Sequence, residues 1–201
     1  MQQECLAKSI MTSKRDGDGR CSARALVWLV AVLAGCAALP DDAPVVDHLD
    51  EQTGLTIARL GHPLELYVEA PRADPASRFG FFGPFETNQM GQRQPYLWLA
   101  LPVEPVADPP KATVTVNGVP LALTEAGHAP GFAGLATPPY KISTPWFATY
   151  YFRIDAAMVQ TIGQANEIAV LVTEDTRNGP VESRFTLKVA EDPRLREFAA
   201  H

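Results

Sequence analysis

The sequence predicts an all-β fold, and three observations support this. All 18 prolines of the 201 residues lie from Pro40 onward, a density that disfavours long helices and suits short strands joined by turns. Apolar and polar residues alternate with period two in 63–70 and in 181–189, as in strands that bury one face and expose the other. Asn117-Gly118 lies between two β-type runs, and this dipeptide favours a type I′ hairpin because both residues tolerate positive φ.

Three strands are expected in the first half of the proline-containing part of the chain. The first is the alternating segment 63–70. Segment 94–103 (QPYLWLALPV) is apolar on both faces, which is typical of a central strand. Its expected partner is 77–88 (SRFGFFGPFETN), which is joined to it through residues 89–91.

The second half is expected to begin with the hairpin 113–123 (TVTVNGVPLAL). Pro120 indicates that the second strand of this hairpin lies at a sheet edge, because proline has no N–H to donate. Segments 147–154 and 167–174 are further expected strands, and 181–189 is the last.

One short helix is expected between 147–154 and 167–174. Asp155 is placed to cap its first turn, and Gly163 to end it. Met158 and Ile162 are four residues apart and therefore share one face of this helix.

About nine strands and one short helix suit two packed sheets, a sandwich that is immunoglobulin-like in broad shape. The three cysteines are Cys5, Cys21 and Cys36, so the inter-sheet disulfide of true immunoglobulin domains cannot form. The resemblance is therefore to an architecture and not to a family. We expect the sandwich over 53–190 and a C-terminal tail over 191–201.

The N-terminal segment has the features of an export signal. Residues 25–35 (ALVWLVAVLAG) form an apolar run of signal-peptide length, and four basic residues precede it: Lys14, Arg15, Arg20 and Arg24. The run ends in Leu33, Ala34, Gly35 and Cys36. This tetrad resembles the lipobox of bacterial lipoproteins.

The resemblance implies that Cys36 receives a diacylglycerol, that the signal peptide 1–35 is removed, and that the new amino group is acylated, for example with palmitate. Ala37 follows the cysteine, and in lipoproteins of this kind the absence of Asp at that position favours the outer membrane. Segment 36–52 is polar, acidic and proline-containing, and we expect it to be a tether. Two alternatives are an ordinary signal peptide with a chance cysteine and an uncleaved helix. Translation could also start at Met11.

Composition excludes some classes of protein. Apolar residues make up 46% of the chain, which is too many for a disordered protein. The net charge is −6, and no basic cluster follows the signal segment, so no nucleic-acid partner is expected.

No catalytic or metal-binding motif is found. The four histidines lack ligand spacing, and no serine lies in a nucleophile motif. No metal and no cofactor are therefore expected. The four histidines are His48, His62, His128 and His201.

The segment 124–146 is the candidate binding loop, since ordered loops of this length are uncommon and are often functional. Its aromatic and histidine side chains are His128, Phe132, Tyr140 and Trp146. They could form a platform for a sugar, a peptide or a proline-rich partner. The alternative is that they fold back and cover an open end of the sandwich.

Three functions remain open on this evidence. The first is a non-catalytic, lipid-anchored envelope protein that faces the periplasm or the cell surface and binds a protein partner or a cell-wall polymer. The second is a carbohydrate-binding module in which Trp146 and Tyr140 stack on sugars. The third is an enzyme whose carboxylates meet in a cleft, with Glu86 and Asp155 as the residues to inspect.

Overall fold

The computed structural model describes residues 44–68, 79–103, 110–143, 147–176, 179–188 and 192–201. These ranges belong to one compact unit, Pro40–His201. In chain order the strands are β1 (Val45–Asp50), β2 (Leu55–Leu60), β3 (Leu64–Val68), β4 (Phe79–Gln89), β5 (Gln92–Leu101), β6 (Lys111–Val116), β7 (Val119–Pro120), β8 (Thr124–Gly127), β9 (Ala148–Arg153), β10 (Glu167–Thr176) and β11 (Gly179–Lys188). The helices are the 3-10 helix η2 (Pro130–Ala133) and the α-helices α2 (Ala156–Gly163) and α3 (Arg194–Ala200).

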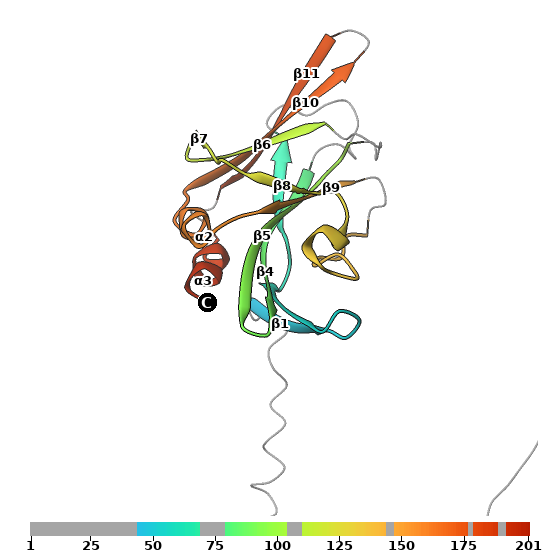
Figure 1. Cartoon of the computed structure of the whole chain (residues 1–201). Coiled ribbons are helices and arrows are strands. Elements are labelled where there is room, and N and C mark those ends of the chain that lie inside the picture. The colour runs from blue at the N-terminus through green and yellow to red at the C-terminus, as the bar shows by residue number, and fades with distance from the viewer. Residues whose placement is uncertain (1–43, 69–78, 104–109, 144–146, 177–178, 189–191) are drawn as a thin grey trace, which may run out of the picture. The chain divides into compact units, whose positions relative to one another are not determined.

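The strands form one curled antiparallel sheet (Figure 1), so the predicted all-β class is confirmed. The order is β7-β6-β10-β11-β3-β4-β5-β9-β8, and β2 and β1 extend from β4 as a branch. β4 is long enough to pair with two neighbours in succession: its first part pairs with β3 and its second part with β2. The hydrogen bonding is therefore continuous through β4, and two separate immunoglobulin-type sheets are not confirmed.

Most of the predicted strands and turns are present. β4 and β5 pair from Phe81 opposite Ala100 to Gln89 opposite Gln92, and they turn at Met90 and Gly91, which both have positive φ. Asn117 and Gly118 also have positive φ, at 50° and 80°, and join β6 to β7 as predicted. Pro120 lies in β7, the strand at one end of the sheet order, where a missing N–H is tolerated.

The predicted helix is α2. Asp155 Oδ1 accepts a hydrogen bond from the Met158 N–H at 2.7 Å, which confirms the cap. Ile162 is buried and Met158 is partly buried against the core, so the expected face of the helix points inward.

Three boundaries differ from the prediction. β1 lies within the segment assigned to the tether, because Val45 to Asp50 pair residue by residue with β2. β8 lies within the segment assigned to a loop and pairs with β9. The segment assigned to the tail contains α3, which buries Leu195 and Phe198, three residues apart and thus on one helix face. There are consequently eleven described strands and two short α-helices, where about nine strands and one helix were expected.

Large aromatic side chains fill the centre of the core. Gly83, Trp98 and Tyr151 lie opposite one another on β4, β5 and β9. Tyr140 packs over this row, with its ring centroid 5.1 Å from that of Trp98. Gly83 is required here, because a Cβ at this position would lie 2.6 Å from Cζ of Tyr140. The core is thus anchored by a residue from the segment that was expected to be a binding loop.

Candidate functional site

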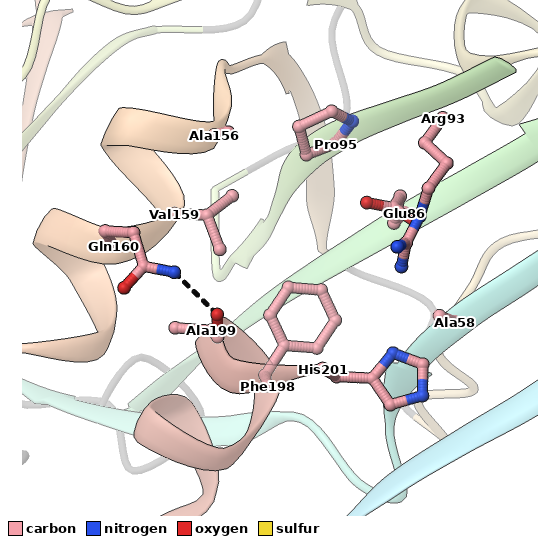
Figure 2. A pocket seen from close by; sticks show the side chains of 10 residues that line it. All are labelled: Ala58, Glu86, Arg93, Pro95, Ala156, Val159, Gln160, Phe198, Ala199 and His201. Carbon is pink, nitrogen blue, oxygen red and sulfur yellow. Dashed lines mark hydrogen bonds and ion pairs between the residues drawn. The ribbon is translucent and has the colours of Figure 1, made fainter.

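A pocket of about 320 Å³ lies between one face of the sheet and the two α-helices (Figure 2). β2, β4 and β5 form its floor, and α2 and α3 form its walls. The floor residues are Ala58, Glu86, Arg93 and Pro95, and the wall residues are Ala156, Val159, Gln160, Phe198, Ala199 and His201.

The strand register explains why the floor residues meet. Glu86 of β4 lies opposite Ala58 of β2 and opposite Pro95 of β5. Arg93 lies opposite Asn88, one step along the same face. Residues opposite each other in an antiparallel sheet point to the same side. These side chains therefore face the helices, while the stacked Phe85–Tyr96 pair of the alternate residues faces the core.

Helical spacing explains why the wall residues lie together. Val159 and Gln160 lie three and four residues after Ala156, so both are its neighbours on one face of α2. Gln160 Nε2 donates to the Ala199 carbonyl at 2.6 Å, which ties α2 to α3 beside the pocket. Phe198 of α3 points its ring into the space between the helices and the floor (Figure 2).

The contact between the helices depends on Gly163. An added Cβ at this position would overlap the Cβ of Ala199 and lie 3.2 Å from the Leu195 carbonyl oxygen. The missing side chain therefore lets α3 approach α2 closely enough to close this side of the pocket.

Gly163→Ala is expected to lower the free energy of unfolding by about 1–3 kcal/mol, as overpacking of a close contact does. Chemical denaturation of the full chain measures this. The double variant Gly163→Ala with Ala199→Gly removes the overlap and is expected to recover part of the loss. A single variant as stable as the parent protein would contradict the close contact.

Charged groups line one edge of the pocket. Arg93 Nε donates to Glu86 Oε1, and the two side chains are 51% and 19% exposed. A smaller hollow of about 170 Å³ adjoins the pocket and shares Glu86, Arg93 and His201 with it. There His201 Nε2 lies 3.9 Å from Asp47 Oδ2. The site thus combines an apolar wall with an ion pair at its edge.

The two carboxylates singled out from the sequence are not paired with each other in this site. Glu86 lines the pocket, but Arg93 is its ion-pair partner. Asp155 caps α2 and does not line the pocket. Two carboxyl groups that act as general acid and general base must lie in different environments of one cleft, and Glu86 and Asp155 do not form such a pair.

Tyr140 is not available as a surface platform. It is 1% exposed, its hydroxyl donates to the Pro84 carbonyl, and this oxygen accepts from the Leu60 N–H at 3.2 Å. Burial raises the pKa of Tyr140 well above its ordinary value. The carbohydrate-binding hypothesis therefore loses one of its two stacking residues, and the other, Trp146, lies outside the described residues.

Phe132 and His128 remain at the surface but also make structural contacts. Phe132 is 58% exposed, and one side of its ring lies against Gly127. His128 Nδ1 donates to the Thr149 carbonyl at 3.0 Å, and Nε2 lies 2.8 Å from Glu125 Oε1. The bond to Thr149 holds the segment against β9.

The remaining predicted residues are dispersed or not described. His48 lies in β1, His62 lies between β2 and β3, and His201 follows α3. Within the described ranges, no three His, Cys, Asp or Glu side chains are grouped so as to hold a metal ion. The lipobox residues Leu33, Ala34, Gly35 and Cys36 lie outside the described part of the chain.

Sequence reasoning missed the pocket, although part of its signal was present. Residues 86 and 88 are two apart on one strand, and residues 93 and 95 are two apart on the next. A turn at 90–91 places 88 opposite 93 and 86 opposite 95, so all four lie on one face. The missing information was α3, because a seven-residue helix gives little periodicity to detect.

Comparison of the chain with protein-family models, with curated proteins and with solved structures finds no match. In the described ranges no helix is both long enough and apolar enough to cross a membrane.

Proposed function

We propose that this chain is an exported lipoprotein of the bacterial cell envelope, anchored by lipid on Cys36. The supporting observation is the order of features at the N-terminus: basic residues, the apolar run 25–35 and the tetrad that ends in Cys36. Several acyl chains on one cysteine hold a protein at a membrane far more firmly than one chain does. Ala37 after the cysteine favours the outer membrane, with the domain on its periplasmic or surface side.

The folded part is a non-catalytic binding domain, and the pocket between the sheet and the helices is its candidate site. Its partner is an envelope protein or a cell-wall polymer. An apolar concave surface with a few polar groups at its edge is the usual form of a binding site. The finer architecture belongs to the same proposal: the curled sheet forms two packed layers. β7 and β8 are the two ends of the strand order, and only Leu121–Leu123 link them. The two ends therefore lie close together, so the sheet curls back on itself.

Cys36→Ala is expected to move the protein from the membrane fraction to the soluble envelope fraction or to leave it as unprocessed precursor. The reason is that no acyl chain can then be attached. Fractionation of cells grown with labelled palmitate measures both the location and the lipid. Cys21→Ala is the matched control, because it removes a cysteine of the same segment outside the lipobox, and it is expected to change neither.

Two results together would contradict this proposal. One is membrane association that Cys36→Ala leaves unchanged, and the other is the absence of label on the parent protein.

A further inference from the structure

The pocket presents two different surfaces to an occupant. Pro95 of the floor and Val159 and Phe198 of the walls supply an apolar surface. Arg93 lies at the edge of the same pocket, with its guanidinium directed toward the space beside Glu86 and His201 (Figure 2). An occupant that matches both surfaces has an apolar body and a polar group at one end.

The guanidinium of Arg93 is held in place but retains donors. Its Nε is engaged by Glu86 Oε1, and Glu86 is fixed by its position in the middle of three paired strands. Within the described residues, no hydrogen bond from the two terminal nitrogens of Arg93 is found. A guanidinium carries five N–H donors in a planar fork that matches a carboxylate, so the terminal nitrogens can bind an acceptor.

The charges at the site favour a singly charged anion. Glu86 is already neutralised by Arg93, and the other nearby carboxylate, Asp47, lies in the adjoining hollow beside His201. A ligand cation would compete with Arg93 for Glu86. The two carboxylates repel a dianion about twice as strongly as a singly charged anion, because the Coulomb energy is proportional to the charge. A carboxylate gains charge-assisted hydrogen bonds from Arg93 without displacing an existing pair.

We propose that this pocket binds a carboxylate that is attached to a short apolar body. The carboxylate accepts hydrogen bonds from the terminal nitrogens of Arg93, and the body packs against Phe198, Val159 and Pro95. This inference rests on the pocket being the binding site of the proposed function and names the chemistry of its ligand; a fatty acid would be a ligand beyond the protein or polymer partner proposed there. The volume of about 320 Å³ is near the lower end for ligand pockets, roughly 300–1,000 Å³. It therefore suits one apolar residue at the carboxyl end of a peptide, or a short fatty acid.

Four probes test this chemistry on the unaltered protein. N-acetylleucine represents a peptide terminus and hexanoate a fatty acid, and N-acetylleucinamide and hexanamide are their neutral counterparts. The full chain is purified from whichever cell fraction contains it, and binding is followed by titration with ligand-observed NMR. For ligands this small, dissociation constants on the order of 1 mM are expected.

Each acid is expected to bind about tenfold or more tightly than its amide, because only the acid gains the charge-assisted bonds. Binding of N-acetylleucine alone would identify a peptide terminus as the source, and binding of hexanoate alone a fatty acid. Equal binding of acid and amide would overturn the inference, as would no binding of either acid.

Arg93→Gln is expected to remove the preference for the acid while binding of the amide remains. Arg184→Gln is the matched control. Arg184 also pairs with a glutamate on the sheet, Glu167, but it does not line this pocket. A variant Arg93→Gln that keeps the preference would overturn the assignment of Arg93, and the comparison of acid with amide on the parent protein holds even if the variant fails to fold.

Failure here is distinguishable from failure of the proposed function. If neither acid binds while Cys36→Ala releases the protein from the membrane, the proposed lipid anchor is supported and only the proposed ligand chemistry is wrong. If the acids bind while Cys36→Ala changes nothing, the pocket is correct and the anchor is wrong.

Discussion

Gly83→Ala is expected to lower the free energy of unfolding by about 3 kcal/mol, at the upper end for overpacking in a core. The new Cβ would lie 2.6 Å from Cζ of Tyr140. The Tyr140 ring cannot turn aside easily, because it is 1% exposed and packs 5.1 Å from Trp98 between centroids. If the ring moves, its hydroxyl leaves the Leu60 N–H and the Pro84 carbonyl, both of which are buried.

Urea unfolding of the full chain, followed by tryptophan fluorescence, measures this loss. Gly131→Ala is the matched control, since nothing lies within 4 Å of an added Cβ there and its φ is not positive. That variant is expected to stay within about 0.5 kcal/mol of the parent protein. Equal stability of the two variants would show that Tyr140 does not cover Gly83.

A double variant separates the steric effect from other effects of the new methyl group. In a Tyr140→Ala background, Gly83→Ala no longer meets a ring, so its additional effect is expected to fall below about 1 kcal/mol. Contacting residues show such coupling and distant residues do not.

The local rules of turns and caps could be applied directly to the sequence. Asn117-Gly118 specifies its own hairpin through positive φ, and the residues on both sides then follow the period of a strand. Asp155 caps α2 through a bond to a residue three positions away. These features depend on neighbours in the chain, and for this reason they could be predicted.

The position of Tyr140 depends on residues distant in the chain and could not be predicted in the same way. In the sequence it belongs to a segment rich in proline and glycine, which is typical of surface loops. In the structure its hydroxyl binds backbone groups of Leu60 and Pro84, which are 80 and 56 residues away. An exposed and a buried tyrosine have the same local sequence signal, so only the tertiary structure decides between them.

The candidate site also depends on contacts between residues distant in the chain, so it could not be predicted either. Its floor is formed where β2, β4 and β5 pair. The sequence predicted the β4–β5 hairpin but not β2. Its walls require α3 to pack on α2, and this contact depends on Gly163 and Ala199 meeting across 36 positions. Gly163 was interpreted as a helix stop, whereas its lack of a side chain also permits this packing.

Trp98→Ala is expected to have the largest effect of any single variant considered, a loss of about 3–5 kcal/mol in the free energy of unfolding. Trp98 is fully buried in β5 and lies opposite Gly83 on one side and Tyr151 on the other. Its removal takes away the apolar contacts of the indole and leaves a cavity that the flanking strands cannot close, since both are paired along their length. Calorimetry and urea unfolding followed by far-UV circular dichroism measure the loss.

Trp98→Phe and Met90→Ala calibrate this result. Trp98→Phe keeps most of the apolar volume and is expected to lose less than half as much, whereas Met90, at the fully exposed β4–β5 turn, is expected to contribute almost nothing. A Trp98→Ala variant that loses under about 1 kcal/mol would contradict a packed core at this position. The combination with Gly83→Ala is the sharpest test. Removing the indole gives the Tyr140 ring room to shift, so the double variant is expected to lose less stability than the two single losses together.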